Sequence, residues 1–400
     1  MNAPAPLRLA QRTAHIAPFY VMEMAKAAQA LAQEAAGSDR PMIFLNIGEP
    51  DFTAPAAVQA AAQAAIAQGA TQYTPATGLP ALRERISHWY AQRWGVAVAP
   101  ERIVVTAGAS AALQLVTLAL LEPGDEMLLG DPSYPCNRHF VSAAGARPVL
   151  LPADAAQRFQ PDPDQVRRAW GPHTRGVLLA SPSNPTGTSI APEALADMAA
   201  TVRQRGGVLM VDEIYLGLSF DARFGQTALA LGEDVISINS FSKYFNMTGW
   251  RLGWLVLPPA LVPVVEKLAQ NLYICASTVA QHAALACFEP ETLAEYERRR
   301  SVFKERRDRF IPGLNALGLT VPVLPDGAFY AWADCRAACA RLGVPDSWAL
   351  AHTLMQQAHV AATPGRDFGV AQTAHYLRFS TANAVSELDQ ALQRLKELLA

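Results

Sequence analysis

The sequence predicts an α/β fold in two domains, and three observations support this prediction. The chain has 400 residues, more than one hydrophobic core usually organises. Its middle is a series of Val-, Leu- and Ile-rich runs separated by helix-length segments, which is typical of a mostly parallel sheet covered on both faces. A second, shorter series of strand and helix patterns begins near Leu319. The expected division is a large domain of residues 51–290 and a smaller α/β domain of residues 1–50 and 291–400.

The N-terminal segment is expected to contribute an arm, a helix and a short strand. Residues 1–14 form the arm, and the Ala-rich stretch after it predicts a helix that ends at Gly37. The motif PMIFLNIGEPDF, residues 41–52, predicts a short strand that breaks at Gly48.

The central region predicts strands that alternate with helices. The strand patterns are RIVVTAG (102–108), EMLLGDPSYP (126–135), RPVLLPA (147–153), RGVLLASPSNPTG (175–187), GGVLMVDEIY (206–215), DVISINSFSK (234–243) and RLGWLVLP (251–258). Helices are expected at 54–68, in a segment that ends near Trp94, and at 109–121 and 192–205.

The last third changes character after Pro258. Residues 260–310 read as long helices, and the charged run EYERRRSVFKERRDRF (295–310) predicts a solvated helix face rather than a binding patch. The second α/β unit follows, with strand patterns at LTVPVLP (319–325), GAFYAWAD (327–334), VAATPGRDFG (360–369) and HYLRFSTA (375–382), a helix near 346–358 and a closing helix.

The composition excludes some classes of binding partner and indicates the cellular compartment. The chain is 51% hydrophobic and 17% charged, with a net charge of −2, which argues against nucleic acid or an anionic membrane as a partner. No apolar run approaches the roughly 18 residues that a membrane span needs. The five cysteines show no metal-binding spacing, and their scattered, odd number suits a reducing compartment. We therefore expect a soluble, cytoplasmic protein without a metal site.

Lys243 is distinguished from the other lysines by its surroundings. The chain has five lysines, and Lys26, Lys267, Lys304 and Lys396 lie in stretches that read as solvated helix faces. Lys243 instead lies among aromatic and hydroxyl side chains directly after a buried strand. Desolvation and a neighbouring cation would lower its pKa, as Schiff-base chemistry requires. A lysine that merely borders a turn is the alternative.

Other polar residues follow the predicted strands, where ligands bind in parallel α/β sheets. Gly108 ends one strand, so the N–H groups of Ala109 and Ser110 would open a helix and form an anion site, although many such turns bind nothing. Ser240, Ser242 and Arg251 would add the hydroxyls and the guanidinium that usually surround a phosphate.

Three further strand ends carry polar side chains. Asp212 follows four apolar residues, and an aspartate there is costly to bury unless it is paired. Tyr215 lies three residues later, and Tyr134 in DPSYP could stack on a flat ring. Asn184 lies between Ser183 and a proline, and by itself this position favours a simple turn asparagine over a binding residue.

Together these residues resemble the class I and II aminotransferases, which are fold type I enzymes that depend on pyridoxal 5'-phosphate. The resemblance covers nearly the whole chain, and its motifs are NIGEPDF (46–52), YTPATG (73–78), SPSNPTG (181–187), VDEIY (211–215), SFSKYFNMTGWRLGW (240–254) and LRFSTA (377–382). It implies a large domain with a mostly parallel seven-stranded sheet and a smaller α/β domain.

The resemblance also implies a role for each site residue. Lys243 would carry the cofactor and move a proton, and Asp212 would keep the ring nitrogen protonated. Asn184 and Tyr215 would bind the phenolic oxygen, and Tyr134 would stack on the ring. Ala109, Ser110, Ser240, Ser242 and Arg251 would hold the phosphate.

Three residues are expected to contact the substrate or a second subunit. By resemblance, Arg378 grips the substrate α-carboxylate, and Gly48 makes a backbone contact near it. Alternation within HYLRFSTA would equally allow Arg378 to lie on an exposed face. Tyr73 matches a tyrosine that reaches the neighbouring subunit's phosphate, which implies a homodimer with shared sites.

The leading interpretation is therefore an aminotransferase that moves an amino group from an L-amino acid to a 2-oxo acid. A C–S β-lyase or an aminocyclopropane-carboxylate-synthase-like lyase on the same scaffold is the alternative, because the same residues would serve it. An effector-sensing domain of a transcription factor is disfavoured, since the fold begins within about 15 residues of Met1. Phe19 and Tyr20 lie where the family's N-terminal segment covers the substrate, which favours an apolar or aromatic substrate side chain.

Overall fold

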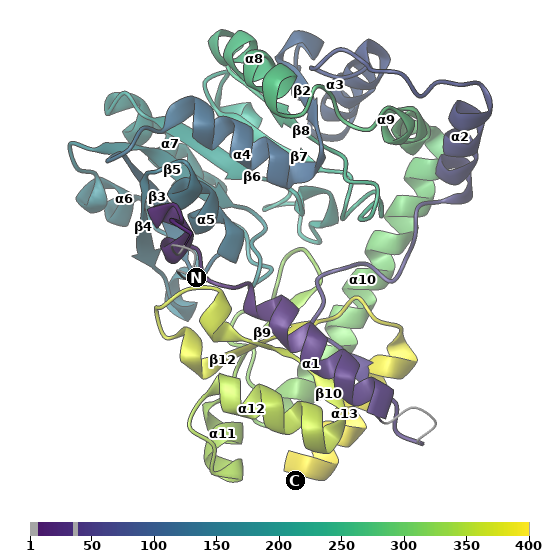
Figure 1. Ribbon diagram of the computed structural model, residues 1–400. Helices are drawn as coiled ribbons and strands as arrows, with labels where there is room; N and C mark the ends of the chain where they lie inside the picture. The colour runs from purple at the N-terminus through teal and green to yellow at the C-terminus, as the bar shows by residue number, and fades with distance from the viewer. Residues whose placement is uncertain (1–6, 35–38, 400) are drawn as a thin grey trace, which may run out of the picture.

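The computed structural model, which describes residues 7–34 and 39–399, has the predicted α/β architecture (Figure 1). Its largest sheet has seven strands in the order β2-β8-β7-β6-β5-β3-β4. In this sheet β8 pairs antiparallel with both of its neighbours, and the other neighbouring strands pair in parallel. The strands are β2 (Ile103–Thr106), β3 (Glu126–Asp131), β4 (Arg147–Pro152), β5 (Thr174–Ala180), β6 (Val208–Asp212), β7 (Ile236–Ser240) and β8 (Gly253–Val256).

Helices cover both faces of this sheet, because successive apolar side chains point to opposite sides of each strand. Met127 and Leu129 belong to the core on one face, and Leu128 belongs to the core on the other. The first face packs against α4 (Gly108–Leu120), α5 (Pro135–Ala143) and α8 (Val262–Leu272). The second packs against α6 (Pro163–Ala169) and α7 (Pro192–Gln204), and at its β2 end against α2 (Ala56–Ala67), α3 (Pro80–Trp94) and α9 (Thr278–Leu285).

The N-terminal segment packs against the C-terminal third of the chain. β1 (Ile43–Phe44) pairs in parallel with β10 (Val360–Ala361). A second, antiparallel sheet has the order β11-β12-β9. Its strands are β9 (Tyr330–Asp334), β11 (Thr363–Pro364) and β12 (Tyr376–Ser380), and the helices around it are α1 (Tyr20–Glu34), α11 (Arg336–Leu342), α12 (Ser347–Thr353) and α13 (Val385–Leu399) (Figure 1).

The smaller part has a hydrophobic core of its own, which supports our proposed division near residues 51–290. One core gathers apolar side chains from α1, β1 and the C-terminal elements. The others gather side chains mainly from the seven-stranded sheet and its helices, and one of them also includes Phe303, Phe329 and Tyr330 from beyond residue 290. The division stays a proposal, and the predicted helix end at Gly37 lies outside the described residues.

α10 (Pro290–Ala316) is a helix of 27 residues that runs from the large sheet to the small one (Figure 1). The prediction that its charged run forms a solvated face is wrong for two arginines. Arg306 is buried and forms a two-pronged ion pair with Asp51, with N–O distances of 2.7 and 2.8 Å. Arg307 is also buried and donates to the carbonyl of Pro325. Both arginines therefore tie α10 to other segments.

The predicted strand at LTVPVLP is also wrong, since only an isolated bridge between Thr320 and Asp334 forms there. Two prolines within seven residues remove backbone donors that a ladder needs. Across the part of the chain that the structure describes, no helix combines the length and apolar character that crossing a bilayer requires.

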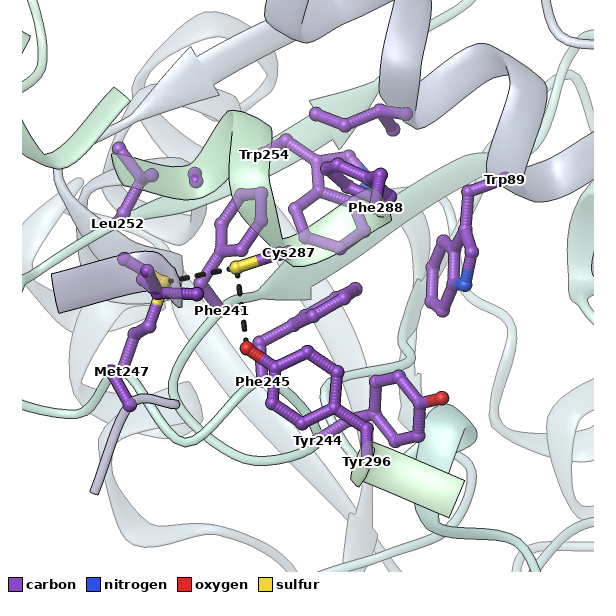
Figure 2. Packing of buried hydrophobic residues seen from close by; sticks show 14 of the residues in the cluster. Trp89, Phe241, Tyr244, Phe245, Met247, Leu252, Trp254, Cys287, Phe288 and Tyr296 are labelled. Atoms are coloured by element: carbon purple, nitrogen blue, oxygen red, sulfur yellow. Dashed lines mark hydrogen bonds between the residues drawn. The ribbon is translucent and has the colours of Figure 1, made fainter. Parts of the chain in front are cut away.

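A cluster of buried aromatic side chains surrounds the segment that carries Lys243 (Figure 2). Phe241 lies two residues before the lysine, and Tyr244 and Phe245 follow it directly. Phe245 contacts Trp89 at a ring-centroid distance of 5.2 Å, and Phe241 contacts Trp254 at 5.0 Å. Because closely packed side chains fix the backbone on both sides of Lys243, its position is set before any ligand binds. The other four lysines lie on exposed helical positions, as predicted.

Candidate active site

A cleft with about 990 Å³ of empty space, solvent at its mouth included, lies where β5, β6 and β7 end. This is the edge of a parallel sheet at which ligands usually bind. The predicted site residues line this cleft, with the exception of Tyr73. They are Gly48, Ala109, Ser110, Tyr134, Asn184, Asp212, Tyr215, Ser240, Ser242, Lys243, Arg251 and Arg378.

Lys243 extends into the cleft from the turn after β7. Its Nζ donates a hydrogen bond of 2.6 Å to the carbonyl oxygen of Gly48. Burial lowers the pKa of Lys243 to about 8, with the charges of Arg378 and Arg251 acting in the same direction. A side chain at position 48 would place its Cβ 2.2 Å from the Tyr330 hydroxyl, so glycine is needed for this close approach.

Asp212 is the last residue of β6 and is buried below the cleft. Its Oδ1 accepts a hydrogen bond of 3.1 Å from the N–H of Ile214. Within the described residues, no side chain forms a hydrogen bond or ion pair with this carboxylate at these distances. Burial raises its pKa to about 6, although Lys243 opposes this shift. A buried carboxylate of this kind would be stabilised by a cationic N–H donor.

A second group of residues that line the cleft is rich in hydrogen-bond donors. Gly108 has a φ of +80° and opens α4, whose first N–H groups lack partners within the helix. A Cβ on Gly108 would lie 2.7 Å from Nη2 of Arg251, so the guanidinium lies directly against this turn. Ser240 and Ser242 join their hydroxyls at 3.0 Å beside it. Helix N–H groups, hydroxyls and a guanidinium together favour an anion.

Arg378 lies on β12 and is only 2% exposed, so the exposed-face interpretation is wrong. Its Nη1 donates to Oδ1 of Asn184 at 2.8 Å, and its Nη2 donates to the carbonyl of Asn46 at 2.7 Å. The guanidinium lies 4.5 Å from the ring centre of Tyr330 and 4.9 Å from that of Phe368. Its Nε–H is buried and has no hydrogen-bond partner among the residues that the structure describes. A donor held this rigidly and left partly unpaired is suited to a carboxylate ligand.

Tyr134 and Tyr215 lie on the walls of the cleft. Tyr134 immediately precedes α5, and its ring meets that of Phe19 edge to face at 6.2 Å. The hydroxyl of Tyr215 is 2.6 Å from that of Tyr330, so these phenols share a hydrogen bond. Burial raises the pKa of Tyr215 well above its usual value. Burial raises the pKa of Tyr134 in the same way, so Tyr134 and Tyr215 are both neutral near pH 7.

Tyr73 does not reach the cleft of its own chain. It lies between α2 and α3, and 79% of its surface is exposed. The prediction that it serves a second subunit stays a prediction.

Sequence reasoning missed residues that complete the site. Asn46, Tyr330 and Phe368 position Arg378, and Val21 and Met22 form part of the apolar wall. Tyr330 could have been found only by pairing GAFYAWAD with HYLRFSTA, which places Tyr330 opposite Ser380. Asn46 acts through its backbone carbonyl, for which a side-chain pattern gives no signal.

The lining fits the cofactor that the resemblance implies. Among the described residues that line the cleft, three are cations and Asp212 is the carboxylate. The donors of Arg251, Ser240, Ser242 and α4 suit a phosphate, and the buried carboxylate of Asp212 suits a pyridinium N–H. Lys243 lies among these groups.

Comparisons with known proteins agree with this geometry. The chain matches the family model for aminotransferase class I and II over residues 40–395. It is 37% identical to the valine–pyruvate aminotransferase of Mycobacterium tuberculosis over 384 residues, which cover 96% of both chains. It is 34% identical to the aspartate/prephenate aminotransferase of Thermus thermophilus, over 93% of this chain and 94% of that one.

Solved structures give the same result. The crystal structure of an aminotransferase from Mycobacterium tuberculosis matches with a TM-score of 0.91 at 36% identity, over 98% of this chain and 99% of that one. The Thermus thermophilus aspartate aminotransferase with maleate also gives 0.91, at 32% identity, over 98% and 100% of the chains. These relatives give no support to the lyase alternative. The chain therefore belongs to the class I and II aminotransferases and is a pyridoxal-phosphate-dependent enzyme of fold type I.

Proposed function

We propose that this cleft exchanges an amino group between an L-amino acid and a 2-oxo acid on a pyridoxal phosphate attached to Lys243. The observation that supports this assignment most is that Lys243 and Asp212 line the same cleft. The lysine has a lowered pKa there, and the buried carboxylate has no side-chain partner in the described part of the chain. A solvated surface lysine would keep its ordinary pKa and would not share a cleft with an unpaired buried carboxylate.

The remaining polar residues would hold the cofactor. Asp212 would pair with the ring nitrogen, Tyr134 would stack on the ring, and Asn184 and Tyr215 would bind its phenolic oxygen. The phosphate would be held by the N–H groups of Ala109 and Ser110, the hydroxyls of Ser240 and Ser242, and Arg251. When bound, the cofactor withdraws electron density from the substrate's Cα–H bond, so that the proton can leave.

Lys243 moves this proton. Because the pKa of Lys243 is about 8, a substantial fraction of this side chain is neutral at mildly alkaline pH when it is not attached to the cofactor. A neutral Nζ can accept a proton from the substrate Cα. Gly48 supplies the carbonyl that holds Nζ in the cleft.

Arg378 orients the substrate. Its guanidinium is fixed by Asn184, Asn46 and two aromatic rings, so little conformational entropy is lost when it binds the α-carboxylate. Binding the carboxylate there leaves the substrate side chain to contact the apolar part of the cleft.

That apolar part favours amino acids with apolar side chains. Its residues come from the N-terminal segment, the segment after β1 and α4, and they are Phe19, Val21, Met22, Ile47 and Leu113. The three cations of the described lining are already assigned to the cofactor and the α-carboxylate. A second carboxylate on the substrate would therefore be desolvated without a partner. The name of the valine–pyruvate aminotransferase relative is consistent with this substrate class.

We propose further that the enzyme is a cytoplasmic homodimer. Tyr73 is exposed and lies beyond its own cleft, which supports a role in the neighbouring subunit. Cys136, Cys275, Cys287, Cys335 and Cys339 are all free thiols, which supports a reducing compartment.

Borohydride reduction tests the attachment site. The purified protein is expected to be yellow, and reduction followed by peptide mapping should place the cofactor on Lys243. An adduct on another lysine, or failure to bind the cofactor under any condition, would contradict the assignment.

A panel of donors and acceptors tests the reaction. L-Valine, L-leucine, L-alanine, L-phenylalanine and L-aspartate would be assayed with pyruvate, 2-oxoglutarate and oxaloacetate. The expected result is amino-group transfer with higher kcat/KM for the apolar donors than for aspartate. A preference for aspartate would refute the proposed substrate class, and release of ammonia and pyruvate from a cysteine conjugate would favour a lyase.

A further inference from the structure

The first turn of α1 forms one wall of the cleft, although most of this helix packs elsewhere. Phe19, Val21 and Met22 line the cleft. The rest of α1 packs through Met24 and Ala28 into the core of the smaller sheet. The wall of the substrate side-chain site is therefore the end of a helix whose body is anchored away from the cleft.

This helix lacks an N-cap acceptor of its own. The carbonyl of Phe19 accepts from Met22 N at 2.9 Å and from Glu23 N at 3.3 Å, which makes Phe19 the N-cap residue. A phenylalanine side chain cannot accept hydrogen bonds from the first free N–H groups of the helix. These donors need an acceptor from another part of the chain.

Asp367 supplies that acceptor from a position 346 residues away. Its Oδ2 accepts from the N–H of Val21 at 2.8 Å, and the backbone N–H of Tyr20 also stabilises the charged carboxylate. Only 1% of the Asp367 surface is exposed. The positive end of the α1 dipole adds to this attraction. Asp367 thus acts as an N-cap in trans for the turn that lines the cleft.

The residues on both sides of Asp367 strengthen the connection. The Arg366 guanidinium lies 4.7 Å from the ring centres of both Tyr20 and Trp348. Phe368 lies 4.9 Å from the guanidinium of Arg378. Three consecutive residues therefore link the apolar wall to the proposed carboxylate clamp.

The same segment is also fixed to the large sheet. Arg138 on α5 donates from Nη2 to the carbonyl of Asp367 at 2.8 Å, and Ser133 N donates to the carbonyl of Phe368 at 2.8 Å. The buried carboxylate of Asp131 accepts from Val370 N and Ala371 N. Asp367 therefore sits on a rigid support, from which it can hold the wall in one position.

We propose that Asp367 is a positioning residue that determines substrate specificity, because it sets the distance between the Phe19–Met22 wall and the Arg378 clamp. The inference rests on the proposed function, since it assumes that the substrate side chain occupies the apolar part of the cleft. Asp367 does not touch the reacting atoms. Its effect should grow with the size of the substrate side chain and should be small for alanine.

The test compares Asp367→Ala and Asp367→Asn with the wild-type holoenzyme. We expect Asp367→Ala to lower kcat/KM for L-leucine about tenfold more than for L-alanine, mainly through KM, because a displaced wall loses contacts that only the longer side chain makes. Asp367→Asn keeps one acceptor oxygen and should fall between the wild type and Asp367→Ala. Hydrogen exchange of the backbone amides of residues 20–22 should accelerate about tenfold in Asp367→Ala, since the capping bond is lost.

Asp162→Ala is the matched control. Asp162 caps α6 through a hydrogen bond to Gln165 N and does not line the cleft. It should lower stability by a similar amount and leave the leucine-to-alanine ratio unchanged.

Two results would overturn the inference. One is an equal loss for leucine and alanine in Asp367→Ala, which would make the residue merely structural. The other is an unchanged ratio despite faster exchange at residues 20–22, which would show that the wall does not select substrates. Failure of the wild-type enzyme to use either amino acid would instead refute the proposed function, and the exchange measurement would still report on the tether.

Discussion

Replacement of Arg378 by lysine tests the substrate clamp most directly. In the wild-type structure the guanidinium donates to Asn184 and Asn46 at the same time and lies within 5 Å of the ring centres of Tyr330 and Phe368. A single ammonium cannot make two parallel bonds to a carboxylate while also satisfying both protein acceptors. We expect kcat/KM for amino acids and 2-oxo acids to fall by about 2–3 kcal/mol, or roughly 30- to 150-fold.

The assay is single-turnover conversion of the holoenzyme, followed by the absorbance of the cofactor. The kcat/KM values for the amino acid and for the 2-oxo acid should both fall, because each substrate presents a carboxylate to Arg378. A monoamine without a carboxylate should react at a similar low rate in both proteins. Cofactor absorbance before substrate is added should be unchanged, since Arg378 is not assigned to the cofactor.

Arg394→Lys is the control for the loss of a buried guanidinium. Arg394 is also buried, and it donates to the carbonyl of Pro41 at 2.6 Å, but it does not line the cleft. Its replacement should lower stability and leave kcat/KM nearly unchanged. Loss of cofactor in Arg378→Lys, or unaltered amino-acid kinetics, would show that Arg378 is not the clamp.

Three further predictions concern the cofactor and the second subunit. Asp212→Ala should retain the fold and lose at least about 100-fold in kcat, because the ring nitrogen loses its buried charge partner; near wild-type turnover would make Asp212 structural. In the apoenzyme, competitive acetylation read by mass spectrometry should show Lys243 reactivity rising with pH up to about 8 and then levelling off, because only the neutral amine reacts and burial lowers its pKa. The four exposed lysines are the internal reference, and a Lys243 profile that matched theirs would contradict this. Mixing Tyr73→Phe subunits with Lys243→Ala subunits should restore activity through one intact composite site, and verified hybrids without activity would count against shared sites.

Most of the large sheet could be predicted because its strands are buried on both faces. Such strands are continuous apolar runs, and the polar residue that ends each run marks the sheet edge. Asn184, Asp212 and Ser240 were placed in this way, and all three line the cleft. The argument needs only local pattern and the common direction of parallel strands.

Contacts that depend on distant segments could not be predicted from pattern. Alternation left Arg378 compatible with either face of β12, and its burial follows from Tyr330 and Phe368, which belong to other elements. Arg306 shows the same limit, since its partner Asp51 lies 255 residues away. A charged run looks solvated when its partners are unknown.

The antiparallel direction of β8 has a consequence for how the site could be altered or transplanted. Ser240 and Gly253 are register partners, so the connection between β7 and β8 both leaves and re-enters the sheet at the same edge. Ser242, Lys243 and Arg251 are therefore delivered by one uninterrupted loop rather than by separate strands. The length of this loop matters as well as its packed aromatic side chains: one residue added between Lys243 and Arg251 would separate these two side chains while every strand pair stayed intact. The loop is therefore one structural unit, and transplanting it onto a related sheet would require β8 to be transplanted together with it.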